Sequence, residues 1–132
     1  MGAIDFGEWV APDLEITLGE RTYKVRPPTV DAAKKILAAA VRGEVHLGLV
    51  TGEVPAEVQA ILDGIGDDHP ALGDAYEAMT QDGIPLATID RVAYYAVFYW
   101  ARGREYADTL AKLLWLPRGL ESGSAGGAAP KG

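Results

Sequence analysis

Polar and apolar residues alternate in two short stretches near the N-terminus. Residues 14–18 read Leu-Glu-Ile-Thr-Leu, residues 23–26 read Tyr-Lys-Val-Arg, and the segment 19–22 between them begins with glycine. Alternation of period two is typical of β-strands, and a short polar segment with glycine is typical of a turn. The pattern predicts an N-terminal β-hairpin, which Pro27 and Pro28 end because proline cannot donate a ladder hydrogen bond.

Beyond the prolines, apolar residues recur every three or four positions, as on one face of a helix. A first helix is expected from Val30 to Arg42, capped by the Thr29 side chain and ended by Gly43. Further helices are expected over residues 55–63, from Pro70 to Gly83, over Leu86–Arg102 and over Glu105–Leu116. The sequence therefore predicts an α+β, mainly α fold, in which the hairpin is followed by four or five helices.

The expected helix Leu86–Arg102 is apolar on nearly every side and carries a cluster of aromatic residues. Core packing is one explanation, because small helical domains need large apolar side chains in their centre. The other is an exposed groove for an apolar helix of a partner protein. In this second interpretation the partner-binding residues are Tyr95 and Phe98, with Arg91 and Arg102 on either side of them.

Large apolar residues become scarce after Pro117, where the chain turns rich in glycine, alanine and serine. Such a segment has almost nothing to bury. We expect one globular domain over residues 1–117 and a flexible, disordered tail over residues 118–132. Removal of the tail is expected to leave the melting temperature nearly unchanged.

The charge of the chain narrows the choice of partners. Its 132 residues carry a net charge of −7, which disfavours binding to nucleic acid or to an anionic membrane. Residues 43–90 include ten acidic residues and no Lys or Arg. This region is either a solvated acidic surface or a surface that steers or shields a basic partner. Since no secretory signal is evident and the apolar run Val92–Ala101 is too short to cross a bilayer, a cytosolic location is expected.

The sequence contains few candidate catalytic, phosphate-binding or metal-binding residues. There is no cysteine, no glycine-rich phosphate loop, and no serine outside the expected tail. A possible metal site is the group Asp63, Asp67, Asp68 and His69, which offers oxygen and nitrogen ligands, but its spacing fits no calcium loop. The segment Asp68-His69-Pro70 is explained equally well as the start of a helix. His46 has no second ligand at a metal-binding spacing. We therefore expect no enzyme activity, no cofactor and no metal.

Five blocks of the sequence are distinctive, namely Asp5–Trp9, Leu14–Thr29, Leu72–Met79, Asp82–Pro85 and Trp100–Ala107. They resemble blocks of small tail assembly chaperones of long-tailed bacteriophages that infect actinobacteria. In that family a short hairpin leads through a Tyr-x-Val-x-Pro-Pro segment into the first helix. The five blocks are structural in character, and the resemblance assigns no contact residue.

The resemblance implies a chaperone that holds the tape measure protein, a long and largely helical chain, and delivers it to the tail tube protein in the host cytoplasm. Self-association is a further expectation. A longer product made by ribosomal frameshifting is also implied, and codons for Ala129-Pro130-Lys131 are able to form a slippery heptamer. The alternatives are a structural phage component, such as a connector or tube protein, and a small metal-binding enzyme.

Overall fold

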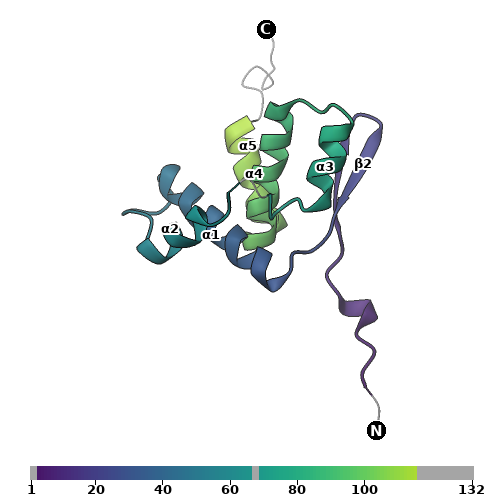
Figure 1. The fold of residues 1–132 in the computed structure, drawn as a ribbon, viewed down its shortest axis with the longest axis horizontal. Helices are drawn as coiled ribbons and strands as arrows, with labels where there is room; N and C mark the ends of the chain where they lie inside the picture. The colour runs from purple at the N-terminus through teal and green to yellow at the C-terminus, as the bar shows by residue number, and fades with distance from the viewer. Residues whose placement is uncertain (1–2, 67–68, 116–132) are drawn as a thin grey trace.

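The computed structural model describes residues 3–66 and 69–115 of the chain (Figure 1). Its elements in chain order are a 3-10 turn η1 (Gly7–Trp9), β1 (Leu14–Leu18), β2 (Arg21–Val25), α1 (Val30–His46), α2 (Ala56–Asp63), α3 (Asp74–Gln81), α4 (Leu86–Arg102) and α5 (Arg104–Trp115). This confirms the predicted α+β, mainly α fold, with a hairpin followed by five helices. Asp67, Asp68, the expected domain boundary at Pro117 and the expected tail over residues 118–132 lie outside the described residues.

The hairpin pairs β1 and β2 antiparallel, with Leu14 opposite Val25 and Leu18 opposite Arg21. The second strand starts two residues earlier than predicted, because the turn contains only Gly19 and Glu20. Gly19 has a φ of 65°, which suits the first position of a type II′ turn. The alternation buries Leu14, Val25 and Tyr23 on the face toward the helices.

Helix α1 begins as predicted but ends later. The Thr29 hydroxyl accepts a hydrogen bond from the amide of Ala32 at 3.2 Å and caps the first turn. The prediction that Gly43 ends the helix was wrong, because α1 continues through it to His46. Gly43 is buried in the helix, and its missing side chain lets α4 come close.

The segment before α3 is a series of turns rather than helix. The predicted helix from Pro70 begins only at Asp74, because Gly73 takes a φ of 55°. The indole nitrogen of Trp100 donates to the carbonyl oxygen of Ala71 at 3.1 Å and so fastens these turns to α4. The predicted bounds of α4 were correct, and those of α2 were correct to within one residue. Helix α5 begins one residue before its predicted start, and its predicted end at Leu116 lies outside the described residues.

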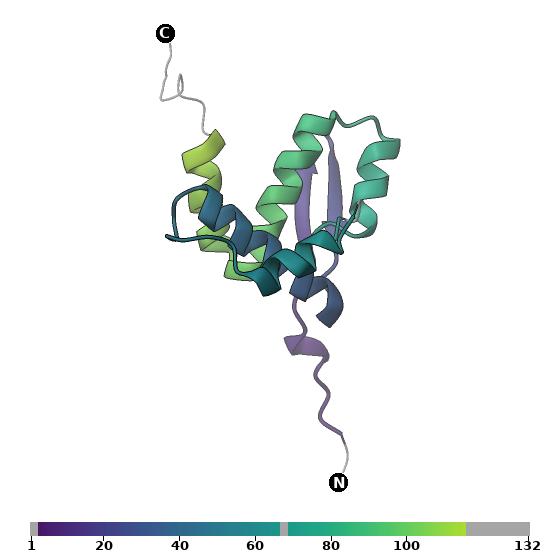
Figure 2. The same cartoon turned by 60° about the vertical axis from the view of Figure 1, so that its left-hand side comes forward.

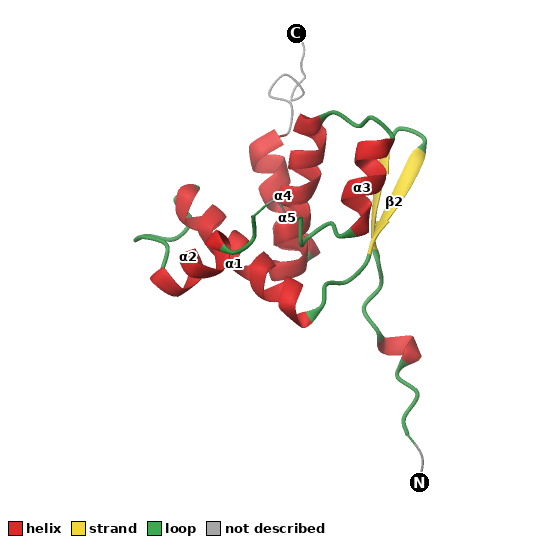
Figure 3. Ribbon diagram, viewed as in Figure 1, coloured by secondary structure: helices red, strands yellow, loops and turns green. Residues whose placement is uncertain are grey.

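Helix α4 occupies the centre of the domain. It packs on both α1 and α5, while α3 packs on β2 and α2 packs on α1. In Figures 1 and 3, α3 and the hairpin lie on one side of α4, and α2 lies on the other side next to α1. One buried cluster joins the hairpin, α1, α3 and α4, and a second joins α1, α4 and α5. Within the described residues, no helix is both long enough and apolar enough to span a membrane.

Candidate partner-binding surface

The predicted site residue Phe98 lies in the core. Its side chain is 1% exposed and packs with Ala40 of α1 and with Ala107 and Leu110 of α5. The prediction that Phe98 forms an exposed groove was therefore wrong. It faces inward because α5 folds back along α4 and covers this face of the helix.

Tyr95 and Arg91 also have partners within the domain. Tyr95 is half-buried, and its hydroxyl donates a hydrogen bond to the carboxylate of Asp108 on α5. Burial and this hydrogen bond raise the pKa of Tyr95 to about 12. The guanidinium of Arg91 lies 5.8 Å from the ring centre of Trp115. Tyr95 and Arg91 thus tie α4 to α5 and do not form a shared binding face with Phe98.

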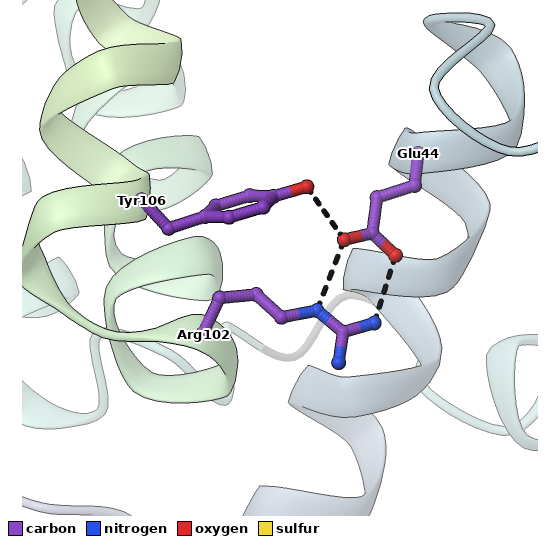
Figure 4. Close-up of polar contacts among 3 residues, drawn as sticks. All are labelled: Glu44, Arg102 and Tyr106. Atoms are coloured by element: carbon purple, nitrogen blue, oxygen red, sulfur yellow. Dashed lines mark hydrogen bonds and ion pairs between the residues drawn. The ribbon is translucent and has the colours of Figure 1, made fainter.

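Arg102, the fourth predicted site residue, belongs to a polar network at the junction of three helices (Figure 4). Its Nε donates to Oε2 of Glu44 at 2.9 Å, and its Nη2 donates to Oε1 at 2.8 Å. The hydroxyl of Tyr106 donates to the same Oε2 at 2.7 Å. Glu44 is 6% exposed and is the one buried charged residue in the described part of the chain.

Electrostatics keep this network charged at neutral pH. The hydrogen bond from Arg102 lowers the pKa of Glu44 against the opposing effect of burial, and the bond from Tyr106 lowers it further. Burial and the carboxylate together raise the pKa of Tyr106 to about 12. Both shifts move away from neutrality, so the network is unsuited to proton transfer at neutral pH. Its effect is to hold α1 against the start of α5.

A groove of about 560 Å³ lies beside this network, and we call it the α5 groove. Tyr106, Leu110 and Leu113 form one wall at a spacing of four and then three residues, and Leu49 contributes from the loop after α1. Leu113 is 70% exposed and Leu49 is 52% exposed. The full lining is Leu49, Arg102, Glu105, Tyr106, Thr109, Leu110 and Leu113.

A second groove, of about 500 Å³, lies between α1 and α4, and we call it the α1–α4 groove. Its walls are mainly apolar. Among the described residues that line it, three carry a basic or imidazole side chain and one carries a carboxylate. It is lined by Ala39, Arg42, Gly43 and His46 of α1, by Asp90, Ala93, Tyr94 and Val97 of α4, and by Ile65 and the segment His69–Leu72.

Of the four predicted site residues, Arg102 alone lines the α5 groove, and none lines the α1–α4 groove. The residues missed by the sequence analysis are chiefly Leu49, Leu110 and Leu113. The signal for Leu110 and Leu113 was the apolar repeat of the last helix, but the same repeat is expected of a helix face that is buried in the core. Leu49 lies in the loop after α1, outside this repeat.

A family model described as a domain of unknown function, DUF7426, matches residues 4–131 of the chain. The chain belongs to the DUF7426 family. The match covers the hairpin, all five helices and the residues before the hairpin from Ile4 onward. Neither a curated protein nor a solved structure matches the chain.

The acidic region of this DUF7426 domain is mostly solvent-exposed. Glu44 is buried in the network, and Asp82 accepts hydrogen bonds from Arg21 and from the hydroxyl of Tyr23. The other acidic residues that the structure describes between positions 43 and 90 are exposed, namely Glu53, Glu57, Asp63, Asp74, Glu77 and Asp90. Among the described residues, no group of three metal-ligating side chains occurs.

Proposed function

We propose that this DUF7426 protein is a tail assembly chaperone of a long-tailed actinobacteriophage. It binds apolar helical segments of the tape measure protein in the host cytoplasm and promotes assembly of the tail tube. The observation that carries the proposal is the α5 groove, whose apolar wall includes a leucine, Leu113, that is 70% exposed. The resemblance of several sequence blocks to tail assembly chaperones supplies the identity of the client.

The shape of the α5 groove suits a helix. Tyr106, Leu110 and Leu113 follow the i, i+4, i+7 repeat of a helical ridge, and such ridges pack into the grooves of a second helix. A client helix with apolar residues at the same spacing covers Leu113 and contacts Leu49 on the opposite wall. Before it is enclosed by the tail tube, a long helical client exposes apolar faces of this kind.

The negative charge in and around the α5 groove indicates that the client helix carries basic residues. Glu105 lines the α5 groove, and it has no ion-pair partner among the described residues. The chain as a whole carries −7, and most of its described acidic side chains between residues 43 and 90 are exposed. A helix with Lys or Arg beside its apolar ridge is therefore attracted to the groove, and the remaining negative charge keeps the complex soluble.

The groove is held in shape by the Glu44 network. The backbone amide of Leu49 donates to the carbonyl oxygen of Glu44 at 2.9 Å. This hydrogen bond fixes the Leu49 side of the groove relative to Glu44. The side chain of Glu44 binds Arg102 and Tyr106, which belong to the other wall. A preformed groove loses less conformational entropy on binding than a flexible one.

The test is binding of tape measure fragments to the full chain, followed by co-purification and by titration with labelled helical peptides. Leu113→Ser removes the exposed leucine of the groove and is expected to weaken binding about tenfold, as for one buried leucine side chain. The matched control is Leu86→Ser, because Leu86 is 66% exposed at the start of α4 and does not line the groove.

Equal binding by the Leu113→Ser and Leu86→Ser chains would place the client elsewhere on the domain. If no fragment of the tape measure protein binds the unaltered chain, the chaperone proposal fails. Rings or tubes formed by the chain alone would support the structural-component alternative instead.

A further inference from the structure

The residues before the hairpin form an extension, Ala3–Asp13, which we call the N-terminal arm. It projects away from the helices (Figures 1 and 2). Its polar and ring contacts within the described residues are local. The amide of Gly7 donates to the Asp5 carboxylate at 2.9 Å, the amide of Trp9 donates to the carbonyl oxygen of Phe6 at 2.9 Å, and the rings of Phe6 and Trp9 meet edge to face at 5.1 Å.

The arm is unusually apolar for a solvated segment. Ile4, Phe6, Trp9 and Val10 are 77%, 59%, 66% and 63% exposed. Isolated apolar side chains on a surface are ordinary, but here four lie within seven residues and the rings of Phe6 and Trp9 touch each other. Exposed apolar side chains that are grouped in this way are typical of a surface that a partner covers. The family match begins at Ile4, so the arm belongs to the DUF7426 domain.

The α1–α4 groove complements the arm in polarity and charge. Ala39, Ala93 and Val97 give it apolar walls, and its volume of about 500 Å³ falls within the range of roughly 300–1,000 Å³ typical of binding pockets. The arm contains three acidic residues and no Lys, Arg or His. Among its described lining residues are Arg42, which has no ion-pair partner within the described part of the chain, two histidines and one carboxylate, that of Asp90.

We propose that the N-terminal arm of one copy docks in the α1–α4 groove of a second copy, with Phe6 and Trp9 against its apolar walls and Asp5 near Arg42. The arm points away from its own helices, and its eleven residues reach at most about 36–40 Å when extended, enough to cross to a neighbouring molecule. A reciprocal exchange of two arms gives a closed dimer with twofold symmetry. This contact leaves the α5 groove free, so it stands independently of the proposed client site.

Self-association of the full chain is measured by sedimentation equilibrium over a range of concentrations. Phe6→Ser with Trp9→Ser removes the anchors of the arm, and Ala39→Trp fills the groove. Each change is expected to weaken dimerisation on the order of a hundredfold, since an aromatic side chain buries about 150–250 Å². The matched control is Ala33→Trp, which places the same side chain at an exposed position of α1 outside the groove and is expected to leave the dimer unchanged.

A mixing experiment separates docking from misfolding. The Phe6→Ser, Trp9→Ser chain retains an intact groove, and the Ala39→Trp chain retains an intact arm. Mixed together, the two are expected to form a heterodimer through one arm and one groove, although each alone is largely monomeric. Three results would overturn the proposal: a full chain that is monomeric at every concentration, a dimer that survives the loss of Phe6 and Trp9, or a mixture that does not associate.

Discussion

The carboxylate of Glu44 on α1 receives two hydrogen bonds from the guanidinium of Arg102 at the end of α4, although 58 residues separate them in the chain. Because Tyr106 of α5 donates to the same carboxylate, one buried charge links three helices. A paired geometry of this kind is among the stronger hydrogen-bonded contacts in proteins, and loss of one partner leaves the other charge uncompensated.

Glu44→Gln is expected to lower the free energy of unfolding at neutral pH. The amide keeps the size of the side chain but removes the charge that faces Arg102. Because 34% of the Arg102 side chain is exposed, water compensates part of the loss, and the expected effect is about 1–3 kcal/mol rather than that of a fully buried pair. Urea denaturation of both chains measures it. Glu53→Gln, the same change in an exposed loop, is the control.

The effect of Glu44→Gln is also expected to depend on pH. The folded chain holds the pKa of Glu44 below its ordinary value of 4.5, so the unfolded chain binds this proton more tightly. The stabilisation by ionised Glu44 is therefore present above pH 4.5 and is lost as the pH falls through the lower, folded pKa. The difference in stability between the two chains should shrink in acid. A difference of constant size would argue against a role for the charge.

Local patterns predicted most of the fold. The hairpin follows from the alternation before Pro27, and the bounds of α4 follow from the apolar pattern over residues 86–102, which the structure places between Pro85 and Gly103. Gly43 was misassigned because glycine has two uses in helices. It ends a helix in some sequences and permits close packing in others, and the approach of Phe98 that distinguishes them is a tertiary contact.

The candidate site was harder to predict, because exposure depends on which faces the other helices cover. Phe98 and Leu113 both lie in apolar repeats, yet one is 1% exposed and the other 70%. No local feature of either repeat separates them. The pairing of Glu44 with Arg102 was equally hidden, since neither residue lies within a helical turn of the other.

Gly43→Ala is expected to destabilise the domain even though alanine favours helices. A Cβ atom at this position would lie 3.0 Å from Cζ of Phe98 and 3.1 Å from the hydroxyl oxygen of Tyr94. Alanine gains about 1 kcal/mol of helix propensity, but overpacking against a buried ring typically costs about 1–3 kcal/mol. Thermal unfolding should show a lower melting temperature.

Gly64→Ala provides the control for this experiment. Gly64 has a φ of −88°, and an added Cβ atom would meet its nearest neighbour, the carbonyl oxygen of Ile61, at an ordinary contact of 3.5 Å. This chain is expected to be as stable as the original or slightly more so. If Gly43→Ala were equally harmless, α1 and α4 would have room to separate, and the close approach at Gly43 would not limit their packing.

Replacement of both Tyr95 and Phe98 by Ser is expected to unfold the domain rather than to remove a binding site. Truncation of a buried Phe alone costs about 3–5 kcal/mol, a large part of the roughly 5–15 kcal/mol that stabilises a typical domain. Loss of the Tyr95 hydroxyl also leaves Asp108 without its donor. Leu113→Ser is the contrasting change. Because Leu113 is 70% exposed, its replacement should leave the circular dichroism spectrum and the melting temperature nearly unchanged. The opposite result would be a Tyr95→Ser, Phe98→Ser chain that stays folded but no longer binds the client. That result would place the binding face on α4, because only a solvent-accessible Phe98 can be truncated without leaving a cavity in the core.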